Sequence, residues 1–82
     1  MIIGVAIQMG GVWHVLPPPY RHHDIIRRLA DAGMPIPIRG QQGFIDSELG
    51  FVDRIAAAAI ALKEGQVEEL NSPPNLFSED LW

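Results

Sequence analysis

Alternating apolar positions near the start of the chain predict a β-hairpin. Residues 2–8 have apolar or small side chains on both faces of the alternation, so we expect a central strand. One face carries Ile3, Val5 and Ile7, and the other carries Ile2 and Ala6. Gly10-Gly11 can adopt the positive φ that a tight turn requires, and residues 12–16 would return antiparallel. On this second strand Trp13 is expected to fill core, whereas His14 suits a core or a pocket position equally.

The next segment changes to a helical period. Pro17-Pro18-Pro19 cannot supply backbone donors to a sheet, so strand pairing should stop there. From about Arg21 to Ala32 the apolar residues recur three and four positions apart, which predicts an amphipathic helix. Its buried stripe would be Ile25, Leu29 and Ala32, with Ile26 beside them. Gly33 is placed to end the helix in a left-handed conformation.

The second half repeats this order of two strands and one helix. Gln41 to Ile45 and Gly50 to Asp53 are expected to be short strands around a turn at residues 46–49. Asp53 is a natural N-cap for a helix from Arg54 to Glu64, which Gly65 would terminate. The buried stripe expected for this second helix is Ile55, Ala59 and Leu62, with Ile60 nearby.

The predicted order is β-β-α-β-β-α, which indicates an α+β fold with two helices packed on one face of a small antiparallel sheet. We expect a single domain over residues 1–66 and an extended C-terminal tail over residues 67–82. The tail has no regular periodicity but ends in four large apolar side chains: Leu76, Phe77, Leu81 and Trp82. These side chains need an apolar groove, which would belong to the same domain, to a second copy or to another protein.

Composition narrows the class of protein. The 82 residues include no cysteine, which excludes disulfides and cysteine-based zinc sites and fits a reducing, cytoplasmic setting. The apolar runs are far shorter than a membrane span, and the start lacks the basic region of a secretory signal. Residues 1–40 carry four Arg and two Asp, whereas residues 41–82 carry two basic and eight acidic residues. This acidic second half disfavours direct nucleic-acid binding and suits a basic partner surface.

Arginine and histidine gather at the predicted start of the first helix, in Arg21-His22-His23-Asp24. Helix N-termini attract anions, so one interpretation is a pocket for a phosphate or carboxylate. The other is an ordinary polar helix start, with Asp24 bonded to the N-terminal amides. Adjacent histidines point about 100° apart on a helix, so no metal site is expected, and no cofactor motif is present. If the pocket exists, it would be lined by Arg21, His22, His23, Arg39, Gln41, Gln42 and Arg54.

Catalytic motifs are missing. The only hydroxyl nucleophiles besides Tyr20 are Ser47, Ser72 and Ser78, all in expected turns or in the tail. Acid–base chemistry by histidine and carboxylates stays open, but no spacing requires it. We therefore favour a non-enzymatic protein, with a small nucleotide- or phosphate-ester-binding protein or a degraded hydrolase as the alternative.

Several motifs resemble a known group. Gly50 to Arg54, Ile60 to Leu62, Gly65-Gln66 and the ending LFSEDLW resemble a widespread group of small phage and prophage proteins with the pattern "GFvdRxEAxxIAxxxGQ … LFSEDLW". RHHDII, from Arg21, and GQQGF, from Gly40, are similar to motifs in the front halves of that group. The group has a glutamate where this chain has Ala56, so any chemistry of that glutamate would be lost here.

Some small, acidic, cysteine-free phage proteins are anti-CRISPRs, which block target-DNA recognition by a CRISPR effector complex. The resemblance therefore implies a phage-derived inhibitor of host defence that acts in the cytoplasm of the bacterial host and binds such a complex. A homodimer is a further possibility. The candidate partner-binding residues are Glu64, Glu68, Glu69, Glu79 and Asp80, with Phe77 and Trp82 as apolar anchors.

Overall fold

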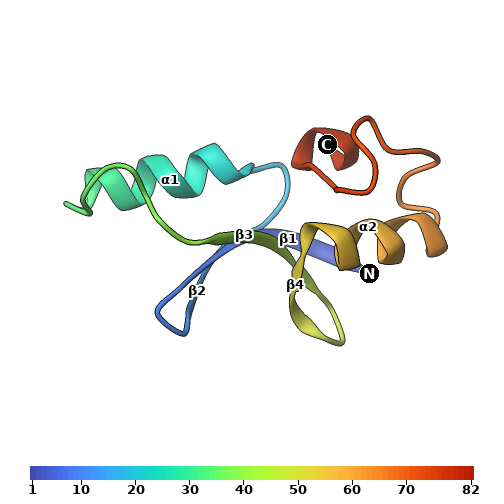
Figure 1. The fold of residues 1–82 in the computed structure, drawn as a ribbon, viewed down its shortest axis with the longest axis horizontal. Coiled ribbons are helices and arrows are strands. Elements are labelled where there is room, and N and C mark those ends of the chain that lie inside the picture. Colours follow the sequence, from blue (N-terminus) through green and yellow to red (C-terminus); the bar gives the residue numbers. More distant parts are fainter.

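The computed structural model describes all 82 residues and shows an α+β fold (Figure 1). The elements are β1 (Ile2–Met9), β2 (Val12–Leu16), α1 (His22–Asp31), β3 (Gln41–Asp46), β4 (Gly50–Asp53), α2 (Arg54–Lys63) and α3 (Ser78–Leu81). The four strands form one antiparallel sheet in the order β2-β1-β3-β4. The predicted β-β-α-β-β-α order is confirmed, and the tail adds the short helix α3 near its end.

Local turn and cap chemistry explains the element boundaries. Gly10 and Gly11 have φ values of 54° and 79°, so the β1–β2 hairpin uses the turn that the sequence predicts. At the start of α2, Asp53 accepts a hydrogen bond from the Ala56 N–H at 2.8 Å, as expected of an N-cap. Gly33 (φ 97°) and Gly65 (φ 72°) follow the ends of α1 and α2 in the left-handed region.

The helices and the tail all lie on one side of the sheet, and the core fills the space between them (Figure 1). Its largest completely buried side chains come from β1, β3 and the tail: Val5, Ile7, Phe44 and Leu76. None of the helices has the length and apolarity needed to cross a lipid bilayer.

The expected buried stripe of α2 is wrong. Ile55 and Leu62 are 56% and 42% exposed and Ala59 is exposed as well, while Ile60 is half-buried. The buried residues of this helix are Ala57, Ala58 and Ala61. Methyl side chains let α2 approach the sheet closely, so the alanines face the core and the larger residues turn outward. The four consecutive alanines make both faces of this helix apolar, so the spacing of apolar residues does not show which face is buried.

The faces of β1 also differ from the simple alternation. A register irregularity lies between Ile2 and Gly4, so Ile2 joins Val5 and Ile7 in the core. Ile3, predicted to be buried with them, is instead 47% exposed. One residue of irregularity is enough to exchange the two faces of a strand.

Trp13 lies outside the main core, contrary to the prediction, and its side chain is 51% exposed. It lies on the sheet face away from the helices, where its ring is 6.3 Å from that of Phe51. These rings come from opposite edge strands and meet because the central strands carry small residues on this face. A Cβ on Gly43 would lie 2.6 Å from the Phe51 ring, so glycine is required there.

Candidate functional site

A polar cluster lies where α1, β3, α2 and the tail meet. Its first member, His22, is buried at the start of α1. Its Nε2 lies 2.7 Å from the Gly43 carbonyl, which can only accept, so Nε2 carries the proton. The ring also packs edge-on against Phe44, with ring centroids 5.0 Å apart. Burial, aided by the charge of Arg54 and opposed by the bond to Gly43, lowers the pKa of His22, which favours a neutral imidazole.

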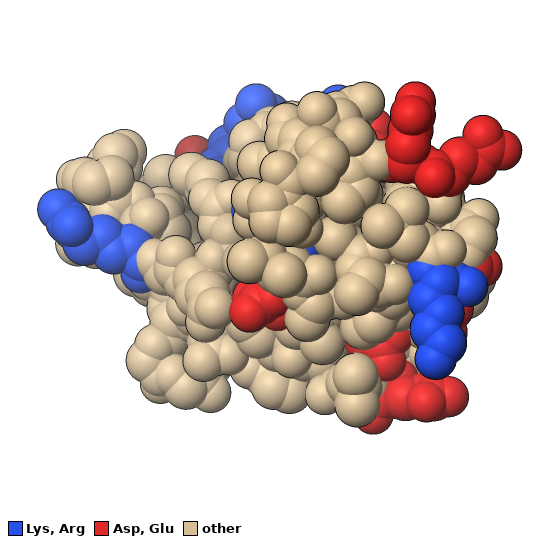
Figure 2. All heavy atoms as spheres, turned by 45° about the vertical axis from the view of Figure 1, so that its right-hand side comes forward, with Lys and Arg blue, Asp and Glu red and all other residues tan.

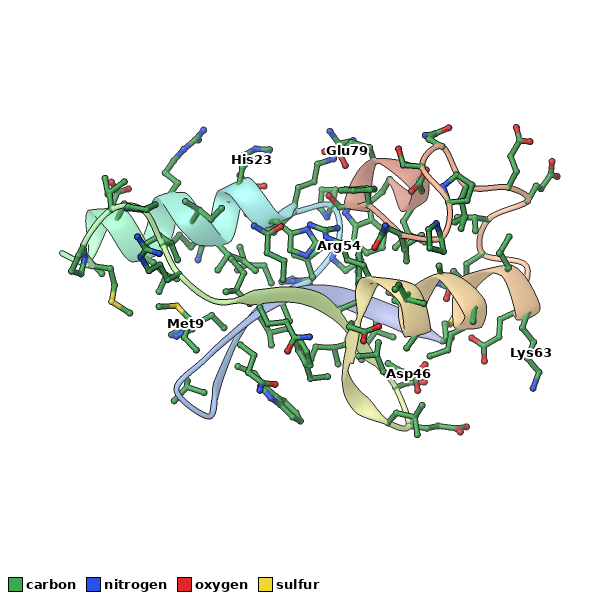
Figure 3. All side chains as sticks on the ribbon, viewed as in Figure 1. Met9, His23, Asp46, Arg54, Lys63 and Glu79 are labelled. Carbon is green, nitrogen blue, oxygen red and sulfur yellow. The ribbon has the colours of Figure 1, made fainter.

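Arg54, the first residue of α2, is the second member. Its guanidinium donates to the Leu76 carbonyl at 2.8 Å and to Oε1 of Gln42, and it stacks on the Phe77 ring at 4.4 Å. Figure 3 shows Arg54 at the centre of the molecule, between α1 and the tail. Burial lowers the pKa of Arg54, and the charge of Glu79 partly offsets this effect. Arg54 thus joins the sheet to the tail.

Arg21, the N-cap of α1, closes the cluster. Its Nε donates to the Trp82 main-chain oxygen at 3.0 Å, and its Nη2 donates to the same atom. In return, Trp82 Nε1 donates to the Tyr20 carbonyl at 2.8 Å. The end of the tail is therefore latched to the start of α1. We call the contacts of Arg21, Arg54, Leu76 and Trp82 the tail latch.

The structure brings together only part of the predicted ligand set. Arg21, His22, Gln42 and Arg54 converge, and all four make hydrogen bonds within the chain. His23 points away into solvent (Figure 3), and its Nε2 lies 3.5 Å from Oδ1 of Asp24. The remaining two residues lie elsewhere: Gln41 is exposed on β3, and Arg39 lines a separate hollow of about 310 Å3 with Met9 and the segment after α1. Ligand binding by this set stays a prediction.

Acidic side chains form the second candidate site. They gather at one end of the molecule, near the end of α2 and the start of the tail, with a cationic side chain among them (Figure 2). Glu64, Glu68 and Glu69 are exposed here, and Lys63 is exposed beside them. Glu64 also lies 2.7 Å from the Met1 amino group. We call Glu64, Glu68 and Glu69 the acidic end.

The Met1 amino group is held between two carboxylates at this end. It contacts Asp46 at 2.6 Å as well as Glu64. Together with the N–H groups of Leu49 and Glu48, this contact lowers the pKa of Asp46 to about 2. Asp46 therefore stays ionised and shapes the β3–β4 turn, and it is not a free charge for a partner.

The other predicted partner residues differ from one another in their surroundings. Glu79 is exposed at the start of α3 (Figure 3). Asp80 accepts hydrogen bonds from the N–H groups of Phe77 and Asn71 at 2.9 and 3.1 Å, which gives it a structural role. Phe77 lies under Arg54, and Trp82 belongs to the tail latch. The acids Glu64, Glu68, Glu69 and Glu79 are thus the ones presented to solvent.

Comparison with known proteins identifies the family of this chain. The family model described as Phage T4 y16D protein matches residues 1–82. The chain belongs to the y16D family. No curated protein and no solved structure matches it. This y16D protein is accordingly a small phage-family protein, as the resemblance indicates, and the family description carries no activity.

The roles of two contributors to the y16D site region were not predicted from the sequence. Gln66 accepts from the Ile2 N–H at 2.7 Å and donates to the Ile2 carbonyl at 3.0 Å, as a neighbouring strand would. The Tyr20 carbonyl holds the indole of Trp82. Gly65-Gln66 is one of the motifs of the resemblance, but the motif does not reveal that Gln66 bonds to Ile2. A main-chain oxygen in a loop has no sequence pattern that would reveal its role.

Proposed function

We propose that this y16D protein is a non-enzymatic inhibitor of host defence, most concretely an anti-CRISPR. It binds a basic DNA-binding surface of a CRISPR effector complex through the acidic end and Glu79, and so blocks target-DNA recognition. The observation that carries the proposal is the exposure of Glu64, Glu68 and Glu69 together at one end of the fold, with Glu79 exposed separately at the start of α3.

The charges at this end are available to a partner. Glu68 and Glu69 form no ion pair within the chain. Lys63 is the one basic side chain of α2 beside them, because Arg54 is turned inward to the tail latch. Glu64 is paired with the Met1 amino group. The unpaired charges of Glu68 and Glu69 steer a basic surface toward this end and speed association.

An apolar contact is needed for tight binding, because rim charges contribute mainly to the rate of association. Leu62 is 42% exposed near the same end of α2 and supplies such a contact. Phe77 and Trp82 are half-buried, and in this proposal they add their exposed parts. Apolar groups within a charged rim are the usual energetic centres of an interface.

Anchoring of the chain on both sides of Glu68 and Glu69 supports the proposal, because it fixes this surface before binding. The residues on both sides of Glu68 and Glu69 are anchored, since Gln66 bonds to β1 and Leu76 is completely buried. A surface that is already ordered loses less conformational entropy on binding. The alternative of nucleotide or phosphate-ester binding has less support, because Arg21 and Arg54 already donate to oxygens of this chain.

The test measures target-DNA binding by purified CRISPR effector complexes of several types, with and without this protein. We expect the wild-type protein to co-elute with one complex and to lower its DNA binding. The double variant Glu68→Gln/Glu69→Gln should need roughly tenfold more protein for the same effect. The control Asp31→Asn removes an exposed acid at the end of α1, away from the acidic end, and should behave as wild type. Unchanged DNA binding with every complex contradicts the proposal.

A further inference from the structure

β2 is a free edge of the sheet, and its sequence lacks the usual protection of an edge. The strand order places β2 outside β1, with no strand on its other side. Edge strands of natural proteins are generally blunted by charged residues, proline or bulges. Residues 12–16, VWHVL, contain neither a charge nor a proline, and the pairing with β1 is regular over all five residues. This edge is chemically able to accept another strand.

The unpaired backbone groups of this edge belong to Trp13 and Val15. A two-residue turn is closed by a hydrogen-bonded pair, which here is Met9 and Val12. Bonded and non-bonded pairs alternate along an antiparallel ladder, so the main chains of Trp13 and Val15 point away from β1. No backbone hydrogen bond outside the helices and strands involves either residue. Two N–H and two C=O groups are thus free along the edge.

A groove runs beside these groups. It has a volume of about 300 Å3 and is lined by the consecutive residues 13–16 of β2. Successive side chains of a strand point to opposite faces, so a hollow that contacts four in a row follows the strand's edge. Its other wall is one face of α1, formed by Ile25, Arg28 and Leu29 at helical spacing. An edge strand facing a helix across a groove is the arrangement in which proteins bind an extended peptide.

The groove has a definite charge. Arg28 is its only arginine, lysine or carboxylate side chain. This guanidinium lies 5.4 Å from the centre of the Tyr20 ring and forms no ion pair within the chain. Asp24, one turn before Arg28 on the same helix, bonds instead to the Arg21 N–H. A cation held beside an apolar groove without a carboxylate partner favours an acidic residue on the bound segment.

We propose that this groove binds an extended segment of a partner polypeptide, which adds to β2 as a fifth strand. The segment carries apolar side chains at alternating positions and an acidic residue next to Arg28. A second copy of this chain fits less well. Pairing β2 with β2 would place the Arg28 side chains of both copies on the same face of the joined sheet, where their charges repel. The groove is lined only by residues of β2 and α1. These two elements lie on the opposite side of the fold from α2 (Figure 1), and the proposal does not depend on the acidic end.

The probes are synthetic six-residue peptides with alternating valine and threonine and one glutamate at either end, and the same peptides with lysine. Binding is measured by fluorescence anisotropy and by shifts of backbone amide signals in NMR. We expect a glutamate peptide to bind at least fivefold more tightly than its lysine counterpart, with the largest amide shifts at Trp13 and Val15. Absence of binding by all peptides up to about 1 mM overturns the proposal.

Two controls separate strand addition from loose apolar contact. Two N-methylated peptides are compared, one methylated at the odd-numbered amides and one at the even-numbered amides. One of them should lose binding and the other should bind nearly as before, because only alternate amides face β2. Arg28→Glu should reverse the preference for glutamate, whereas Arg27→Glu, on the exposed neighbour outside the groove, should keep it. Both variants are compared with wild type for thermal unfolding.

The same measurements reveal a second copy in the groove. In that case the Trp13 and Val15 amide signals of the protein alone would depend on its concentration, and light scattering would show a dimer. That result overturns the assignment to a foreign segment. Strand addition guided by Arg28 is contradicted if both N-methylated peptides lose binding equally, or if the two arginine variants have equal effects.

Discussion

Arg54 and Leu76 are joined by two hydrogen bonds that run in opposite directions. The Leu76 N–H donates to the Arg54 carbonyl at 3.0 Å, and the Arg54 guanidinium donates to the Leu76 carbonyl at 2.8 Å. The Leu76 side chain is completely buried in the same cluster as Phe44 and Ala57. The tail therefore packs on the body of its own chain and contributes to its core.

Leu76→Ala should destabilise the protein strongly, because it removes a completely buried side chain and leaves a cavity. The expected loss is about 2–5 kcal/mol in the free energy of unfolding, measured by urea denaturation. Leu49→Ala is the matched control, since Leu49 is 69% exposed, and it should change stability by less than about 0.5 kcal/mol. Similar values for the two variants would show that the tail is not part of the core.

Arg54→Met should also destabilise the fold, although methionine keeps much of the apolar stem. The change leaves the Leu76 carbonyl and the Gln42 amide without a donor, at a cost of about 2 kcal/mol. Lys63→Met, at the exposed end of α2, removes the same kind of charge without a buried bond and should be nearly neutral. Equal unfolding midpoints for both variants would argue against the tail latch.

The packing of α2 predicts opposite tolerances on its two faces. Ala58→Leu forces extra volume between α2 and the sheet and should cost about 1–3 kcal/mol. Ile55→Gln, on the outward face, should leave thermal stability almost unchanged. If the glutamine variant were the less stable of the two, the stripe predicted from the sequence would be the correct one.

Acid should weaken the fold through His22. Burial lowers the pKa of this imidazole in the folded chain, whereas in the unfolded chain it is ordinary, near 6.5. The unfolded chain therefore takes up a proton more readily as the pH falls, so this contribution to stability is present above about pH 6.5 and is lost toward the lower folded pKa.

The measurement compares urea midpoints at about pH 5 and pH 7. Wild type and His23→Gln should both be less stable at the lower pH, and His22→Gln should lose less stability over this interval. Asp46 does not interfere, because its pKa of about 2 confines its effect to pH below about 4. An unchanged pH dependence in His22→Gln would contradict the role of this histidine.

The sequence was most informative where one residue determines the local geometry. Gly10, Gly33, Gly65 and Asp53 mark turns and caps, and each is found as predicted. Predicting which side chains of a helix or strand face the core was less reliable. The alanines of α2 carry little periodic signal, and the irregularity after Ile2 exchanges the faces of β1. Both depend on how closely neighbouring elements approach, which single-residue patterns do not contain.

The candidate sites show a similar division. The convergence of Arg21, His22 and Arg54 follows from the order of elements, because each lies at a helix start above the same sheet. Their partners could not be predicted, since the oxygens that they bond come from main-chain atoms of Gly43, Leu76 and Trp82. Main-chain contacts over long sequence distances have no signature in residue identity.

The most direct test of the proposed function is hydrogen–deuterium exchange of this protein, free and mixed with the effector complexes. The account predicts that one complex slows backbone exchange in residues 62–69 and around Glu79, while the first turn of α1 is unchanged. Slowed exchange confined to residues 21–28, or no change with any complex, would contradict binding through the acidic end.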